Sequence, residues 1–212
     1  MTSAIGTSST DAPLEGAPRV TRRRKVARAV TEASGPAVCA MAALLVVAIQ
    51  AAGSGAGAAW GGLAAIFVAG VPMGYIVHGV KAGRWSDHHV DSREQRAVPL
   101  LVAAGSVALG IALLLVVHAP RELVALVAAM LAGLLVVLTI THWWKVSIHT
   151  AVAGGVLGIM LVLFGPWALA GLPLLAAVGW SRMVLDAHSR AQVVVGALAG
   201  FTVACALFPA LR

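Results

Sequence analysis

Long apolar runs, separated by short polar segments, make up most of this chain. The runs lie at roughly 36–53, 58–80, 97–118, 122–142, 148–165, 168–181 and 190–210. An α-helix needs about 20 residues to cross the hydrocarbon core of a bilayer, within a range of about 17–25. Most runs reach this length, but 168–181 is short and contains Pro173, which predicts a kinked, tilted or partly shielded helix. The pattern predicts an all-α fold, a polytopic transmembrane helix bundle of six or seven spans.

The composition also favours a membrane protein. The chain is 60% hydrophobic and 11% charged, with a mean hydropathy of +0.93, which is more apolar surface than a soluble domain needs. Cys39 and Cys205 lie inside apolar runs, which indicates small buried side chains rather than a disulfide or a metal site. Small residues recur in the late runs and predict close helix packing. They are Gly154, Gly155, Gly158, Gly196 and Gly200.

The first 34 residues have a different character. Residues 1–18 are rich in small and polar residues, whereas 19–34 carry a basic cluster. The cluster comprises Arg19, Arg22, Arg23, Arg24, Lys25 and Arg28. We expect 1–34 to be a disordered basic tail that touches anionic lipid, and 35–212 to be the transmembrane domain. A nucleic-acid partner is the weaker reading of the basic cluster, and we expect none.

Charged residues also predict the topology. With seven spans, the N-terminal tail and the segments 81–96, 143–147 and 182–190 lie on one side of the membrane. The turns on the other side are short and nearly uncharged. The positive-inside rule then places the N-terminus and the charged face in the cytoplasm, in a bacterial-type plasma membrane.

Two histidines lie where apolar runs begin, beside other polar residues. Ser147 is a candidate N-cap that places His149 in the first turn of one helix. His188 lies at the start of the last run, which Asp186 or Ser189 could cap. Helix N-termini favour anions, so we expect these histidines to share an electropositive cup with Arg182.

Such a pair of histidines suits phosphoryl chemistry. A neutral imidazole can attack phosphorus, and a protonated one can donate a proton to the leaving oxygen. Cationic side chains stabilise the charge on the phosphoryl oxygens. No nucleotide-binding motif accompanies them, so the sequence does not indicate nucleotide-driven chemistry.

The segment 81–96 is too long and too charged for a simple turn. It is either a solvated loop held by ion pairs or a cap that offers arginines to a phosphate. A weaker alternative is a metal site. Its ligands would be Asp87, His88, His89, Asp91 and Glu94.

These residues resemble the motifs of the type 2 phosphatidic acid phosphatase superfamily of integral membrane lipid phosphatases. Ser181, Arg182 and His188 match its Ser-Arg-(five residues)-His motif in register. The family's Pro-Ser-Gly-His motif is matched in part by Ser147 and His149. Its Lys and Arg-Pro motif has only distant counterparts here. They are Arg93 and Arg96 ahead of Pro99, with Arg84 or Lys81 upstream.

The resemblance, which covers roughly residues 80–200, implies a metal-independent phosphatase with no cofactor. His188 would be the nucleophile that forms a phosphohistidine, and His149 the acid for the leaving group. Arg182, Lys145 and Arg96 would be phosphate ligands. The full set of candidate substrate-binding residues is Lys145, Ser147, Ser181, Arg84, Arg93 and Arg96.

One position departs from the family pattern. The Asp that polarises the nucleophilic histidine is Gln192 here, one helical turn after His188. Gln can orient an imidazole but cannot stabilise an imidazolium by charge. Asp186 is a possible substitute if it lies in a loop before the helix.

The sequence favours hydrolysis of a lipid phosphomonoester or diphosphate, with a polyprenyl phosphate, polyprenyl diphosphate or prenyl-linked sugar phosphate as the expected substrate. The expected partners are this lipid and the surrounding membrane lipids. One alternative is a Mg²⁺-dependent prenyl diphosphate transferase or cyclase that uses Asp87, Asp91 and Glu94. Another is a non-catalytic binder or transporter of lipid phosphates.

Overall fold

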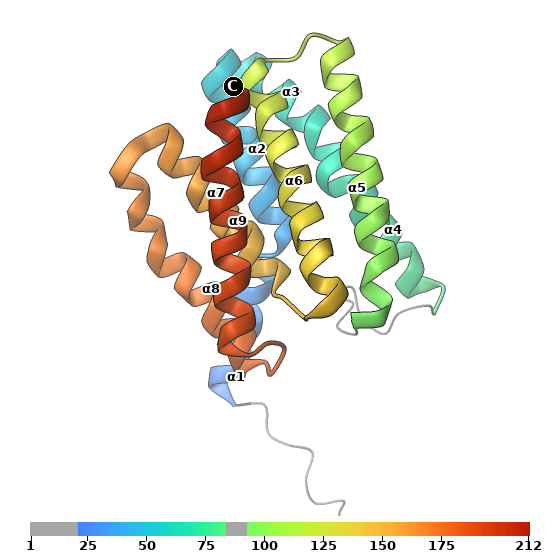
Figure 1. Cartoon of the computed structure of the whole chain (residues 1–212), viewed down its shortest axis with the longest axis vertical. Coiled ribbons are helices and arrows are strands. Elements are labelled where there is room, and N and C mark those ends of the chain that lie inside the picture. The colour runs from blue at the N-terminus through green and yellow to red at the C-terminus, as the bar shows by residue number, and fades with distance from the viewer. Residues whose placement is uncertain (1–20, 84–92) are drawn as a thin grey trace, which may run out of the picture.

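The computed structural model describes residues 21–83 and 93–212, with the side chains of 93–97 excepted. All regular structure in these ranges is helical, and they contain no strand, which confirms the all-α prediction (Figure 1). The helices are α1 (Arg22–Ala33), α2 (Pro36–Ala52), α3 (Ser54–Ala65), the π-helix η1 (Ile66–Gly70), α4 (Val71–Lys81), α5 (Arg93–Val116), α6 (Arg121–Trp143), α7 (Ile148–Phe164), the 3₁₀-helix η2 (Gly165–Gly171), α8 (Leu172–Val184) and α9 (Arg190–Leu211).

Several helical stretches are long and apolar enough to cross a membrane. By length and composition there are 5 in the described ranges, or up to 6 if α1 and α2, which meet at a bend of 42°, count as one span. The stretch Ile148–Val184 counts once, but its chain turns back at η2, so α7 and α8 lie side by side (Figure 1). At 13 residues, α8 is short, as the length of its apolar run predicted, and Pro173 lies in its first turn. At about 1.5 Å per residue it covers about 20 Å, less than the hydrocarbon core.

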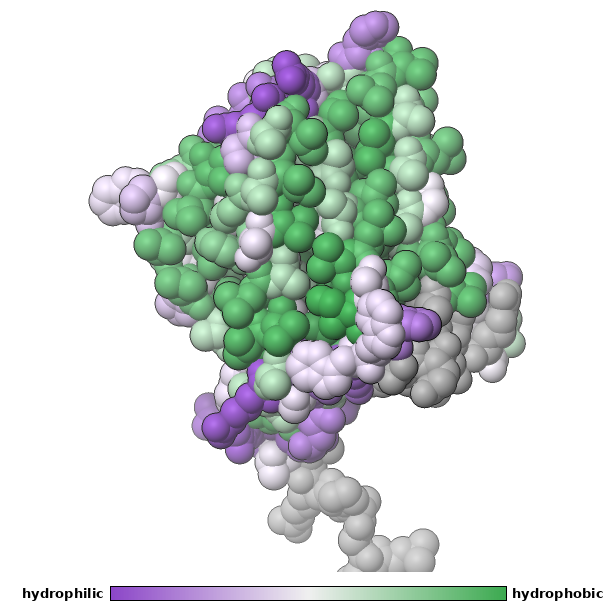
Figure 2. Space-filling view, viewed as in Figure 1, coloured by the Kyte–Doolittle hydropathy of each residue, from purple (hydrophilic) through white to green (hydrophobic). Residues whose placement is uncertain are grey.

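The helices bring several distant segments to one end of the bundle. In Figure 1 this end holds α1, the end of α4, the start of α5 and the turns α6–α7 and α8–α9, while the C-terminus lies at the opposite end. The sequence predicted this shared side, because an even number of predicted spans separates each of these segments from the next. Figure 2 shows hydrophobic residues across the middle of the visible face and hydrophilic residues gathered at the two ends, as expected of a chain solvated by a bilayer.

Residues 22–33 form a helix, which corrects the prediction of a disordered tail for this segment; residues 1–20 lie outside the described ranges. The Thr21 hydroxyl caps α1 by accepting from the backbone N–H of Arg24. Ala27, Thr31 and Ser34 are buried, and this i, i+4, i+7 spacing forms one face of the helix. The sequence did not predict this helix, because its buried face consists of small residues of low hydrophobicity.

Helices α7 and α9 are in very close contact through small residues. A Cβ on Gly196 would lie 2.6 Å from the Ser147 carbonyl oxygen, and Cβ atoms on Gly154 and Gly200 would collide with the backbone of Ala197 and Ala151. Only glycine permits these approaches, so the predicted packing role of these glycines is confirmed. The contact brings the first turn of α7 against the first turn of α9.

Candidate functional site

The first turn of α7 carries His149. The chain enters this helix through an extended residue, Trp144, and Ser147 caps it by accepting from the backbone N–H of Thr150 at 3.4 Å. The N-cap prediction for Ser147 is confirmed. His149 is only 7% exposed, so its imidazole lies in the interior of the bundle, in the turn that Ser147 caps.

The turn after α8 explains the spacing between Arg182 and His188. Asp186 adopts a left-handed conformation with φ 57°, which Asp tolerates better than most residues. Its N–H donates to the Met183 carbonyl at 3.0 Å, and the N–H of Ala187 donates to the Arg182 carbonyl at 3.0 Å. This is the Schellman pattern of helix termination. It turns the chain back, so that the N–H of His188 also donates to the Arg182 carbonyl, at 3.3 Å.

The start of α9 orients His188. Ser189 is the N-cap, as one of the two predicted alternatives, and it forms a capping box with Gln192. The N–H of Ser189 donates to Oε1 of Gln192 at 3.1 Å, and Nδ1 of His188 lies 3.2 Å from the same oxygen. Because the Ser189 N–H is a donor, the Gln192 atom that it contacts is the amide oxygen. Nδ1 of His188 contacts the same oxygen, so Nδ1 must be the ring nitrogen that donates. The neutral imidazole then carries its lone pair on Nε2.

Two hydrogen bonds fix the register between the two histidine-bearing turns. The N–H of Ser147 donates to the Gln192 carbonyl at 3.3 Å. The hydroxyl of Thr150 donates to the Val193 carbonyl at 2.9 Å. The positions of His149 and His188 are therefore coupled through the backbone.

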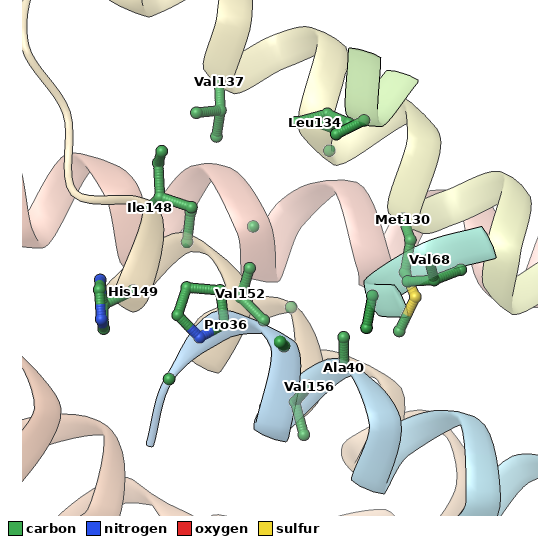
Figure 3. Close-up of a pocket in the computed structure, with 18 of the residues that line it drawn as sticks. Pro36, Ala40, Val68, Met130, Leu134, Val137, Ile148, His149, Val152 and Val156 are labelled. Carbon is green, nitrogen blue, oxygen red and sulfur yellow. The ribbon is translucent and has the colours of Figure 1, made fainter. Parts of the chain in front are cut away.

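One cavity of about 430 Å³ is lined by His149, Arg182 and His188 together. Their exposed fractions are 7%, 4% and 8%. The prediction that these three residues share one pocket at one end of the bundle is confirmed. In Figure 3 His149 lies at one end of this cavity, while Met130 and Val68 lie toward the other, and the remaining labelled residues are apolar. The site thus combines a polar head with an apolar extension into the bundle.

Helix α1 forms part of the cavity wall. The sequence did not predict this role of α1. Thr31 and Glu32 line it, and the buried Thr31 hydroxyl donates to Oγ of Ser181 at 3.0 Å. Arg24 forms an ion pair with Asp186 at 2.7 Å on the outside of the same contact. The available signal was the spacing of Ala27, Thr31 and Ser34 described above.

Three predicted substrate-binding residues do not line this cavity. Ser147 is fully buried and caps α7, and Ser181 is fully buried and donates to the Val178 carbonyl at 2.7 Å. Lys145 is half-buried and lies outside the lining. The two serines therefore position the histidine and the arginine rather than contact a ligand.

The possible orienting role of Asp186 is also corrected. Its carboxylate pairs with Arg24, its side chain is 78% exposed, and Gln192 is the residue that contacts His188. The left-handed turn directs the Asp186 side chain outward.

Several predicted residues lie outside the described part of the chain. They are Arg84, Asp87, His88, His89 and Asp91, together with the side chains of Arg93, Glu94 and Arg96. The backbone of α5 begins at the same end of the bundle as the site (Figure 1). Within the described residues, no group of three or more His, Cys, Asp or Glu side chains is arranged to hold a metal ion, and both cysteines are free thiols.

Comparison of the chain with known protein families, curated proteins and solved structures found no match. The class that the fold defines is an integral membrane helix bundle with a buried His–Arg–His site at one end.

Proposed function

We propose that this protein is a membrane lipid phosphatase that hydrolyses a lipid phosphomonoester or diphosphate through a phosphohistidine. The observation that carries the proposal is the single cavity lined by His149, Arg182 and His188. The motif resemblance supports it independently, because the same three residues match the family's catalytic positions.

In this proposal each of the three residues has a role in the reaction. Nε2 of His188 attacks phosphorus and forms a P–N bond while the P–O bond to the lipid breaks. His149, protonated, donates its proton to the leaving oxygen, and Arg182 stabilises the charge on the phosphoryl oxygens. Water then attacks phosphorus, its proton returns to His149, and the P–N bond breaks to release inorganic phosphate and neutral His188.

The apolar part of the cavity suits the lipid tail. Lining residues such as Val68, Met130, Leu134 and Val152 extend from the histidine end into the bundle (Figure 3). A prenyl or acyl chain would lie there with its phosphate at Arg182. If the charged end faces the cytoplasm of a bacterial-type membrane, the substrates are lipids of the inner leaflet, with polyprenyl phosphates and diphosphates the first to test.

The test is phosphate release from a panel of lipid phosphates by purified protein in detergent or nanodiscs, with and without EDTA. We expect release in both conditions and none from His188→Ala. Release that stops in EDTA would favour the Mg²⁺-dependent transferase or cyclase. No release from any lipid by well-folded protein would refute the phosphatase.

A non-catalytic lipid-phosphate binder is the second candidate, and the neutral Gln192 beside His188 favours it. Binding of lipid phosphates without turnover, by both the wild type and His188→Ala, would support this candidate.

A further inference from the structure

The apolar extension of the cavity has a closed deep end. It runs from the histidine end of the bundle along α6 and α7, where its lining reaches Leu126 and Ile159. Farther from the site, Leu123 on α6 and Phe208 on α9 are each 0% exposed and do not line the cavity. They belong to the same apolar cluster as Leu126 and Ile159. The cavity therefore ends against packed side chains within the bundle.

Two helices give the same depth for the cavity. Its lining runs from Ile148 to Ile159 on α7 and from Val137 to Leu126 on α6. Each stretch rises about 16 Å, at about 1.5 Å per residue. The hydrocarbon core of a bilayer is about 30 Å thick, so one leaflet is about 15 Å deep. The cavity is about as deep as one leaflet.

Three residues from three helices form the floor of the cavity. They are Val107 on α5, Leu126 on α6 and Ile159 on α7, and their exposed fractions are 3%, 0% and 3%. All three belong to one buried cluster, so the core of the bundle fixes the position of the floor. Each of them also lines the cavity, so a change in its size adds or removes space at the deep end.

We propose that Val107, Leu126 and Ile159 set the length of the lipid tail that the site accepts. An extended chain advances about 1.2 Å per bond, so a tail of about twelve carbons reaches the floor when its phosphate lies at Arg182. This inference rests on the proposed function and narrows its substrate class to lipid phosphates with an acyl or short prenyl tail. A long polyprenyl tail would overfill the cavity.

The experiment locates the end of a bound tail. Alkyl phosphonates are the probes, because their P–C bond is not hydrolysed, and each carries a photoreactive diazirine at the end of a tail of eight, twelve or eighteen carbons. Protein in nanodiscs is irradiated with each probe, and the labelled residues are identified by mass spectrometry. The twelve-carbon probe should label Val107, Leu126 or Ile159, and the eight-carbon probe should label shallower residues such as Val156 (Figure 3). A diazirine alkane without the phosphonate identifies labelling of the lipid-facing surface.

Competition by unlabelled phosphonates, at equal mole fractions in the nanodiscs, gives the preferred tail length. The wild type should bind the twelve-carbon tail about tenfold more tightly than the eighteen-carbon tail, the cost expected of overfilling a packed site. Leu126→Ala should raise the preferred length by about two carbons, and Val107→Phe should lower it. Leu135→Ala is the matched control and should change nothing, because Leu135 lies on the same helix as Leu126, is 46% exposed and does not line the cavity.

Three results would overturn the proposal. The first is labelling by the twelve-carbon probe at the same surface residues as the alkane. The second is equal binding of all tails, including a long polyprenyl phosphonate, which would place the tail end in the bilayer. The third is an unchanged length preference in both Leu126→Ala and Val107→Phe. Since phosphonates report binding alone, this inference can fail while lipid phosphates are hydrolysed, and it can hold for a protein that releases no phosphate, in which case the phosphatase proposal fails by itself.

Discussion

Gln192 holds the imidazole of His188 through its side-chain oxygen, which lies 3.2 Å from Nδ1. The same oxygen accepts from the N–H of Ser189, so the helix cap and the orientation of the proposed nucleophile depend on one amide. The contact fixes the orientation and the tautomer of the His188 imidazole, but it places no negative charge beside the ring.

Gln192→Glu should therefore increase turnover. Glutamate has the same shape and retains both hydrogen bonds, and its charge would stabilise the imidazolium-like state of His188. We expect kcat to rise about tenfold. A carboxylate favours the protonated imidazole, so neutral His188 would require a higher pH and the acid limb of the pH–rate profile should move upward. Gln192→Leu should lose about 10–100-fold. A Glu variant slower than wild type on every lipid, with an unshifted profile, would contradict the assignment.

His149→Gln should remove the acid. We expect kcat for an alkyl phosphate to fall about 10²–10⁴-fold. Wild type needs one neutral and one protonated imidazole, so its pH–rate profile should be bell-shaped, and the variant should lose the alkaline limb. An aryl phosphate lipid, whose leaving group needs no proton, should recover most of the rate. Equal losses on alkyl and aryl substrates would argue against this role.

Val152→Phe should obstruct the apolar part of the cavity that it lines. Lipid turnover should fall about tenfold or more, since the tail loses its place, while hydrolysis of a short soluble phosphomonoester should change little. Val194→Phe is the control, because Val194 on α9 is 53% exposed and does not line the cavity. If the two variants behave alike on lipid, the tail does not lie in this cavity.

Thr31→Val should weaken the attachment of α1 to α8. The lost bond to Ser181 is buried, so we expect a loss of about 1 kcal/mol and a melting temperature lower by about 2–4 °C. Arg24→Ala breaks only the exposed pair with Asp186 and should shift melting less. Thermal unfolding in detergent measures both variants. If Arg24→Ala lowers the melting temperature more than Thr31→Val does, charge rather than the buried contact holds α1.

Gly200→Ala should prevent proper packing of α9 on α7, because the added Cβ would collide with the backbone of Ala151. We expect severely reduced yield of monodisperse protein. Gly62→Ala in α3 meets nothing within 4 Å and should be neutral or slightly stabilising. Size-exclusion profiles distinguish the two, and a normal profile for Gly200→Ala would contradict the close helix contact.

The sequence alone determined the long apolar helices, the cap at Ser147 and the shared end of the bundle, and it limited the cap of α9 to Asp186 or Ser189. Each depends on information that can be read along the chain: a run long enough for the bilayer, a hydroxyl before a helix, and an even number of spans between the polar segments. The pairing of His149, Arg182 and His188 was predictable because their spacing resembles a known motif.

Only the tertiary structure decided which residues surround these three. The docking of α1 depends on a face of small residues that meets α8, and hydropathy does not detect such a face. The choice of Gln192 over Asp186 depends on the left-handed turn at Asp186, which directs one side chain outward while the capping box directs the other to His188. Glu32 reached the site for the same reason: long-range packing, rather than local pattern, sets the neighbours of a buried group.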